Sequence, residues 1–477
     1  MAYRFAFGRP PAVAARGMVA TSQPLATRAG LEMLERGGNA ADAALAAAAV
    51  LCVTEPMSTG IGGDCFAVVW RDGRLEGLDS AGPAPRSAEP IAPVEPSGPR
   101  SVTVPGAVAG WAELAGRHGR LGLDACLAAA IDAAERGFAV AARTAARWQQ
   151  AGAPAELGPV PRVGDVVRLP ELGATLRRIA ETGPDGFYRG PVAAAIASAS
   201  WLAEDDLAAF EPRWVEPLRL VYRDTEVVEL PPPTQGVVAL EALGLLERSS
   251  PSLASRIRCA RLALEDGLAR VRDGADVSEL IDPGYLDRRR SGEEVPVTEP
   301  AAGTVYLCAV DEDRTAVSFI QSLFEGFGSR VVARGTGVVL QNRGACFAVS
   351  GAVEPGRRPY HTIIPAMLLR DGALLGPFGV MGGFIQAQAH MQLVSAIVDD
   401  GLDPQAALDR PRFRVDGDLV RLEEGLWERE ADLEQLGYRT VRETNTFSFG
   451  GGQAIFVQGD ALIGGSDPRK DGYAAGL

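Results

Sequence analysis

The chain has 477 residues, of which 47% are hydrophobic and 23% are charged, an ordinary composition for a soluble protein of one large or two ordinary domains. Acidic residues (61) outnumber basic ones (47), and the net charge of -14 repels the phosphates of nucleic acids and anionic lipid surfaces. We therefore expect neither nucleic acid nor a membrane as a partner.

Several features predict a cytoplasmic location. The six cysteines show no CxxC pair and no metal-finger spacing, which favours free thiols in a reducing compartment. Arginines and prolines interrupt residues 1–11, which leaves no apolar core for a secretory signal. The longest apolar run, residues 43–53, is too short to span a bilayer and predicts a buried helix.

Helical patterns dominate the chain before residue 303. Residues 25–36 have the apolar period of a helix that Pro24 begins and Gly37-Gly38 ends, and Asn39 is placed to cap a second, alanine-rich helix. Prolines predict an extended segment over 81–106. The pattern then predicts helices over 107–150, 173–210, 237–246 and 256–272, and an exposed polar loop at about 289–300 that suits a processing site.

A glycine-rich turn at residues 60–64 leads into a predicted strand at 65–70. The turn lacks the third glycine of the dinucleotide-binding pattern, and it precedes a strand instead of opening a helix. We therefore interpret it as a tight turn and predict no nucleotide cofactor.

After residue 303 the pattern changes to strands. Strands are predicted at 304–310, 316–322, 337–341, 366–370 and 373–375, followed by an amphipathic helix at 384–399. This pattern predicts strands inside and helices outside.

Gly303-Thr304 stands at the head of the first of these strands. A threonine hydroxyl becomes a good nucleophile when the α-amine of the same residue, with a pKa of about 7.7 to 8.0, is free to act as its base. Thr304 would generate that terminus by attacking the carbonyl of Gly303, which has no Cβ to hinder the approach. The dipeptide alone is weak support, because most such pairs are ordinary strand or turn residues.

Gly382-Gly383 precedes the helix predicted at 384–399. Its backbone N–H groups, with the helix dipole behind them, could stabilise the oxyanion that forms during acyl transfer. The alternative is a plain turn between a strand and a helix, and both interpretations can hold together.

Eight motifs, taken in order, resemble those of the γ-glutamyltransferase (glutathione hydrolase) family of N-terminal-nucleophile hydrolases. They lie at residues 37–42 (GGNAAD), 55–64 (EPMSTGIGGD), 104–111 (VPGAVAGW), 231–236 (PPPTQG), 304–311 (TVYLCAVD), 358–359 (RP), 382–383 (GG) and 467–472 (DPRKDG). The motifs cover most of the chain, although residues 250–300 match weakly. The details resemble a divergent, acylase-like branch that includes oxamate-amidohydrolase-type members.

The resemblance implies an α+β fold, the four-layer αββα sandwich. It implies Thr304 as the nucleophile, Gly382 and Gly383 as oxyanion donors and Ser322 as a supporting hydroxyl. Cleavage between Gly303 and Thr304 would leave regions 1–303 and 304–477 as one compact unit. The expected partner is therefore the chain's own other fragment in an αβ heterodimer, which could pair further, and no cofactor is expected.

The substrate-binding positions depart from the family pattern. The family arginine that grips the substrate α-carboxylate falls on Ala81, and the aspartate that holds the α-ammonium falls on Cys346. The family's paired serines fall on His361-Thr362 and its strand asparagine on Phe324, and Tyr306 is a further candidate contact. Loss of both charged partners predicts an acyl pocket altered away from glutathione.

Some candidate residues have alternative interpretations. Arg86 and Arg343 could supply a relocated anion clamp, although surface arginines are common. His361 is a candidate substrate contact or a structural histidine, and Cys346 is a buried thiol more readily than a second nucleophile, because no base is identifiable near it. His118 and His390 have no carboxylate or cysteine at metal spacing, so no metal site is predicted.

Three functions remain open from the sequence. The first is a self-processing amidohydrolase or acyltransferase that forms an ester on Thr304 and acts on a small amide or acyl substrate. The second is a variant that cleaves a C–C or amide bond in a specialised metabolite. The third is an uncleaved, catalytically silent homologue that serves as a binding protein.

Overall fold

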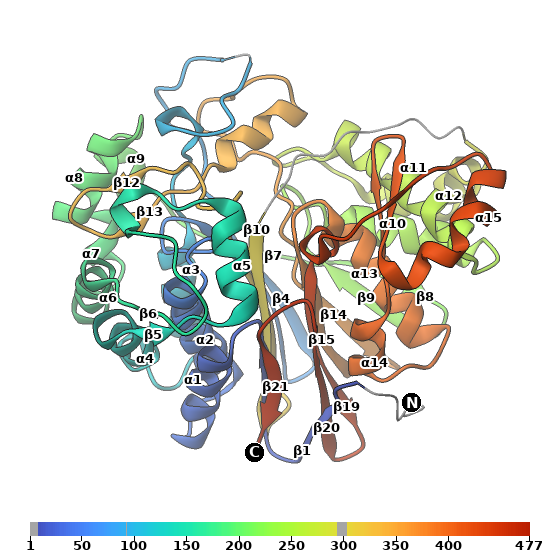
Figure 1. The fold of residues 1–477 in the computed structure, drawn as a ribbon, viewed down its shortest axis with the longest axis horizontal. Coiled ribbons are helices and arrows are strands. Elements are labelled where there is room, and N and C mark those ends of the chain that lie inside the picture. Colours follow the sequence, from blue (N-terminus) through green and yellow to red (C-terminus); the bar gives the residue numbers. More distant parts are fainter. Residues whose placement is uncertain (1–7, 92, 293–302) are drawn as a thin grey trace.

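The computed structural model of the chain describes residues 8–91, 93–292 and 303–477. Two seven-stranded sheets pack face to face at the centre of the molecule, and helices cover both outer faces (Figure 1). This arrangement is the α+β, four-layer αββα sandwich that the resemblance implied. Part of the loop expected at 289–300 lies outside the described residues.

Both sheets are antiparallel throughout. The first sheet has the order β1 (Ala12–Ala14), β20 (Ala461–Ser466), β19 (Gly451–Gln458), β15 (Ala373–Met381), β14 (Ala366–Arg370), β9 (Thr225–Glu229), β8 (Leu218–Tyr222). The second has the order β21 (Tyr473–Gly476), β2 (Met18–Thr21), β10 (Gly303–Val310), β11 (Ala316–Phe324), β3 (Asp64–Arg71), β4 (Arg74–Ser80), β7 (Arg213–Val215). Each sheet therefore takes strands from both sides of residue 303.

The helices fall into two groups (Figure 1). On the side of the second sheet lie α1 (Pro24–Glu35), α2 (Ala40–Thr54), α3 (Ala107–His118), α4 (Leu123–Arg136), α5 (Ala142–Ala151), α6 (Pro170–Thr182), α7 (Asp185–Tyr188), α8 (Gly190–Ala199) and α9 (Glu204–Ala208). On the side of the first sheet lie α10 (Gly236–Glu247), α11 (Leu253–Arg270), α12 (Pro283–Arg289), α13 (Ile385–Val398), α14 (Pro404–Asp409) and α15 (Glu430–Gln435). No helix in the described part of the chain is long and apolar enough to cross a membrane.

The remaining strands are short. They are β5 (Phe138–Ala139) with β6 (Val166–Val167), β12 (Val332–Ala333) with β13 (Val338–Val339), and a small sheet of β16 (Phe413–Asp416), β17 (Leu419–Leu422) and β18 (Arg439–Arg442). They lie outside the two central sheets. The predicted strand at 337–341 is therefore only the short β13.

The apolar core has three main parts. One lies between the second sheet and its helices and includes the whole of α2, whose fifteen residues are all buried. A helix that is apolar on every side needs such cover, and Asn39 caps it as predicted. Another part lies between the first sheet and its helices, and the last fills the space between the sheets.

Two further elements differ from their predictions. β15 runs to Met381, whereas the prediction ended it at residue 375. The prediction stopped early because glycine and proline, here Gly376, Pro377 and Gly379, are uncommon inside strands. Helix α13 is buried nearly all round and is not amphipathic. It packs between the first sheet and helices α10 and α11, so even Gln386 and Gln388 lie in the interior.

Candidate active site

Thr304 occupies the second position of β10 and is only 2% exposed. Its Oγ1 lies 2.6 Å from the carbonyl oxygen of Gly303 and 3.3 Å from Ser322 Oγ. The Ser322 hydroxyl donates to the same carbonyl oxygen at 2.7 Å. The Thr304 hydroxyl therefore lies beside a carbonyl group that a second hydroxyl already polarises.

A β-bulge creates this arrangement. The register pairs Gly303 with Phe324 and Val305 with Gln321, so two residues of β11 oppose the single residue Thr304. Phe324 has a φ of +80°, a left-handed conformation that is rare for a bulky side chain, and its N–H donates to Ser322 Oγ at 2.8 Å. A bulge redirects the side chains beside it, and here it turns Ser322 toward the Gly303 carbonyl.

Gly382 and Gly383 form the turn between β15 and α13, with φ values of +130° and +78°. These conformations suit glycine, and a Cβ at Gly382 would lie 3.0 Å from the Cα of Gly450. Among the residues that the structure describes, neither N–H group has a hydrogen-bond acceptor. The pair thus offers two backbone donors at a helix N-terminus.

The first turn of α13 links these glycines to Thr304. The Gln386 N–H donates to the Gly383 carbonyl at 3.0 Å, and Gln386 Nε2 donates to Thr304 Oγ1 at 3.4 Å. Sequence reasoning did not identify Gln386 as a site residue. Its position three residues after Gly383 is the feature of the sequence that could have indicated it.

Gln235 supports the glycine turn from behind. Its Nε2 donates to the carbonyl oxygens of Gly383 at 3.2 Å and Thr362 at 2.7 Å. The Tyr360 hydroxyl donates to Gln235 Oε1 at 3.1 Å, and the Tyr360 ring stacks on Phe384. Gln235 belongs to the motif at 231–236, which the sequence identified as a family signature without a role.

Four candidate substrate positions come together beside this turn. Arg343 Nη1 donates to Thr362 Oγ1 at 3.2 Å and lies 3.8 Å from Cys346 Sγ, and its guanidinium carbon lies 4.5 Å from the centre of the Phe324 ring. Burial raises the pKa of the Cys346 thiol to about 11 in spite of the nearby guanidinium. Cys346 is therefore a neutral thiol at physiological pH.

The remaining substrate candidates already have internal partners. Both ring nitrogens of His361 are engaged, Nε2 with Asp64 Oδ2 at 2.9 Å and Nδ1 with the Pro359 carbonyl at 2.7 Å. The Tyr306 hydroxyl pairs with Ser318 Oγ at 2.8 Å in the core between the sheets. These contacts hold both side chains in place and leave no free polar atom on them for a substrate.

Ala81 is fully buried and presents only a methyl group. Its N–H donates to Asp79 Oδ1 at 2.9 Å, and its carbonyl accepts Arg358 Nε at 2.6 Å. The arginine of the motif at 358–359 thus binds the backbone of the segment where the family clamp would stand. The position itself carries no charge.

His118 and His390 each lie against a carboxylate that the sequence pattern had not indicated. His118 Nε2 is 3.1 Å from Glu76 Oε2, and His390 Nδ1 is 2.6 Å from Glu229 Oε1. Within the described ranges, no group of three or more His, Cys, Asp or Glu side chains is placed to hold a metal ion.

Comparisons with known proteins identify the family. The γ-glutamyltranspeptidase family profile matches residues 26–477. The chain is 30% identical to the glutathione hydrolase-like YwrD proenzyme of Bacillus subtilis (strain 168), over 98% of this chain and 99% of that protein. It is 34% identical to the oxamate amidohydrolase proenzyme of Klebsiella pneumoniae, over 97% of this chain and 99% of that protein.

A solved structure supports the same family. The crystal structure of cephalosporin acylase from Bacillus halodurans matches with a TM-score of 0.93 and 41% identity, over 100% of this chain and 98% of that one. The family profile covers far more than half of the chain. The protein therefore belongs to the γ-glutamyltranspeptidase family of N-terminal-nucleophile hydrolases, as a divergent member.

Proposed function

We propose that this enzyme cuts its own chain between Gly303 and Thr304 and then acts as an amidohydrolase or acyltransferase through Thr304. The observation that carries the proposal is the triangle of the Thr304 hydroxyl, the Gly303 carbonyl and the Ser322 hydroxyl, whose sides are 2.6, 2.7 and 3.3 Å. Family membership supports it, and two of the relatives are named proenzymes.

Self-cleavage begins when Thr304 Oγ attacks the carbonyl carbon of Gly303. The Ser322 hydroxyl, already bonded to that carbonyl oxygen, stabilises the negative charge that develops on it. The C–N bond then breaks, the proton of the Thr304 hydroxyl ends on the released amine, and an ester joins Gly303 to Thr304 Oγ. Water hydrolyses this ester, which leaves a carboxylate on Gly303 and a free amine and hydroxyl on Thr304.

The mature site uses the new amine as a base. It removes the proton from Thr304 Oγ as the oxygen attacks the carbonyl carbon of a substrate amide. The N–H groups of Gly382 and Gly383 stabilise the oxyanion, and the substrate amine leaves with the proton. Water or a second amine then takes the acyl group from the Thr304 ester.

The two fragments would remain together after cleavage. Both sheets contain strands from both sides of residue 303, and β10 itself pairs with β2 from the first fragment and β11 from the second. Separating the fragments would expose the apolar core between the sheets. We therefore propose an αβ heterodimer made from one chain.

We also propose that the acyl group is not γ-glutamyl. The family clamp positions hold the methyl of Ala81 and the neutral thiol of Cys346, so neither can pair with the charges of an amino-acid head group. The names of two relatives, oxamate amidohydrolase and cephalosporin acylase, support an acyl group of another kind.

Mass spectrometry of the purified protein tests the cleavage. We expect fragments 1–303 and 304–477 from the wild-type chain and an intact 50.1 kDa chain from Thr304→Ala, because that variant has no nucleophile. Thr315→Ala, a buried threonine in the turn after β10, is the matched control and should still be cleaved. A wild-type chain that stays intact under all conditions would contradict the proposal.

A further inference from the structure

Arg343 is a fully buried cation beside the candidate active site. Arginine is almost never fully buried unless its charge is paired. Its Nη1 has the Thr362 hydroxyl as a partner, whereas Nε and Nη2 have none. Among the described residues, no carboxylate forms an ion pair with Arg343.

The two unpaired nitrogens lie on one edge of the guanidinium. The N–H of Nε and one N–H of Nη2 point in parallel, and this pair of donors matches the two oxygens of a carboxylate. The third nitrogen, Nη1, is held at Thr362, and the flat face lies over the Phe324 ring. The side chain is thus held at Nη1 and on one face, while Nε and Nη2 have no partner among the described residues.

The side chains that contact this guanidinium carry no charge. Cys346 is a neutral thiol, Phe324 contributes an aromatic face, and Thr362 contributes a hydroxyl. Glu325 feels the Arg343 charge, but burial raises the pKa of its carboxyl group and the two form no ion pair. A buried cation with free donors and no counter-ion favours an anionic ligand.

Arg343 is also connected to the catalytic groups. Arg343 bonds Thr362, and the carbonyl of Thr362 accepts a hydrogen bond from Gln235 Nε2. The same Nε2 donates to the Gly383 carbonyl. Phe324, under the guanidinium, pairs with Gly303 across the bulge. These contacts therefore link Arg343 both to the glycine turn and to the bulge that contains Thr304.

We infer that Arg343 binds a carboxylate at the far end of the acyl group, so that the substrates are amides of short dicarboxylic acids. The inference rests on the proposed function, because Thr304 and Arg343 are both buried in the intact chain and cleavage at Gly303 must open them to a substrate. It reverses the family's charge pattern at this end of the pocket. An arginine now stands beside the position, Cys346, where the family carries an aspartate for an ammonium group.

Matched substrates test the inference. We would compare the 4-nitroanilides of oxalyl, succinyl and glutaryl groups with their neutral monoamide counterparts, and include γ-glutamyl 4-nitroanilide. For at least one chain length, the wild-type enzyme should prefer the carboxylate over the amide by about a hundredfold in kcat/KM, and γ-glutamyl should be poor. Arg343→Gln should remove this preference, mainly through KM, and Arg343→Lys should keep part of it.

Arg189→Gln is the control, because Arg189 is exposed and pairs with Asp185, and it should keep the wild-type preference. Arg86, the other arginine considered as an anion clamp, is exposed, and its backbone N–H donates to Asp206. Mass spectrometry of each variant shows whether Gly303–Thr304 is still cut and hence whether the site has folded. Two results would overturn the role of Arg343 alone. One is a cleaved wild-type enzyme that shows no preference for the carboxylate substrates. The other is an Arg343→Gln variant whose kcat/KM falls equally for the carboxylate and the amide substrates. A wild-type chain that is never cut would overturn the proposed function and this inference with it.

Discussion

Ser322 shows how much one hydroxyl contributes at this site. It donates to the Gly303 carbonyl and accepts the Phe324 N–H, so its orientation is determined by backbone groups on both strands of the bulge. In the intact chain the Gly303 carbonyl oxygen accepts from Ser322 and from Thr304, so Ser322 is the donor that remains if the Thr304 hydroxyl attacks. Self-cleavage should therefore depend on Ser322 more than on the glycine pair.

We predict that Ser322→Ala slows self-cleavage by about a hundred- to a thousandfold, the usual effect of removing one oxyanion donor. Ser322→Thr keeps the hydroxyl and should retain most of the rate. Time courses of fragment formation from freshly synthesised precursor give both rates. Ser318→Ala, on the same strand but bonded to Tyr306, should cleave at the wild-type rate, and equal rates for Ser322→Ala and wild type would refute the role.

The residues that could be predicted from sequence are those whose role lies in a motif. Thr304 and the glycine pair lie in family motifs, and Ser322 was chosen by comparison with the family's supporting threonine. The structure brings Thr304 and Ser322 together, and their roles stay predictions. The burial of Arg343 and its two unpaired nitrogens could not be predicted, because the sequence does not show whether an arginine is exposed or buried. Its burial depends on Thr362 and Phe324, which come from distant segments.

At the scale of elements, the strand β15, the glycine turn and helix α13 act as one unit. Gly382 adopts a φ of +130°, and a Cβ there would lie 2.8 Å from Ile385 Cγ2 and 3.0 Å from the Gly450 Cα. Any larger residue must therefore shift the turn. Because Ser322 serves the Gly303 carbonyl, such a shift should damage turnover without preventing self-cleavage.

We predict that Gly382→Ala is still cut at Gly303–Thr304 but loses about a hundred- to a thousandfold in kcat, through a displaced oxyanion donor. Gly372→Ala is the control, since Gly372 also has a positive φ of +73° but open space around it. It should lose some stability and keep its turnover. A Gly382→Ala variant with the wild-type kcat, or one that is never cut at Gly303–Thr304, would contradict this role of the glycine turn.

The limits of β15 and α13 show why this unit was only partly predictable. The helix was placed to within a residue at each end, yet its polar face was expected in solvent. In the structure Gln388 bonds the backbone of Val415, and His390 accepts the Val380 N–H and contacts Glu229. Tertiary partners from other segments bury these side chains, and helical periodicity cannot indicate them.

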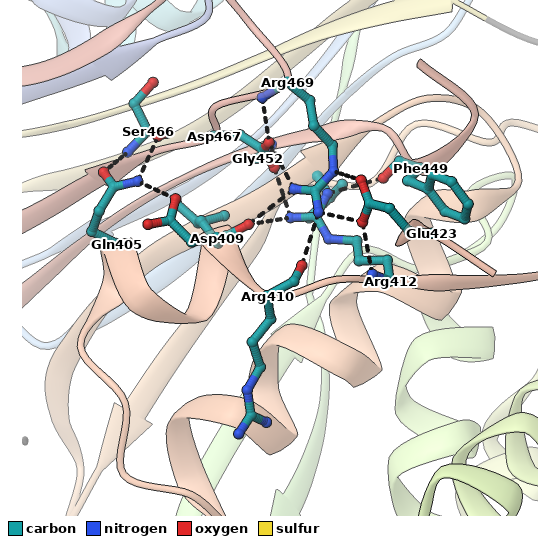
Figure 2. A network of polar contacts seen from close by, with 12 residues as sticks. Gln405, Asp409, Arg410, Arg412, Glu423, Phe449, Gly452, Ser466, Asp467 and Arg469 are labelled. Atoms are coloured by element: carbon teal, nitrogen blue, oxygen red, sulfur yellow. Dashed lines mark hydrogen bonds and ion pairs between the residues drawn. The ribbon is translucent and has the colours of Figure 1, made fainter. Parts of the chain in front are cut away.

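At the scale of the whole molecule, a buried ionic network joins the C-terminal segment to the first sheet (Figure 2). Asp467 binds Arg412 at 2.7 Å and Arg469 at 2.9 Å, and it accepts the Gly452 N–H at 2.9 Å. Gly452 pairs with Val380 in β15, just before the glycine turn. The motif at 467–472, known from sequence only as a signature, therefore secures the strand beside the active site.

The protonation of Asp467 gives this network a pH dependence. Burial would raise the pKa of Asp467, but the ion pairs with Arg412 and Arg469 and the backbone hydrogen bonds outweigh it and lower the pKa to about 2. The unfolded chain takes up this proton at a pKa of about 3.9. The network's contribution to stability is therefore complete above about pH 4 and is lost as the pH falls toward 2.

We predict that Asp467→Asn lowers the free energy of unfolding by about 3 to 5 kcal/mol at neutral pH, because it leaves the buried Arg412 without its counter-ion and leaves Arg469 with Glu423 alone. Chemical denaturation in the Thr304→Ala background, which is expected to remain one chain, measures this difference. The difference should hold from pH 7 down to about pH 4 and shrink below it. Asp185→Asn, which removes an exposed pair with Arg189, should cost less than about 1 kcal/mol at every pH, and an equally small effect of Asp467→Asn would show that the network does not hold the sheet.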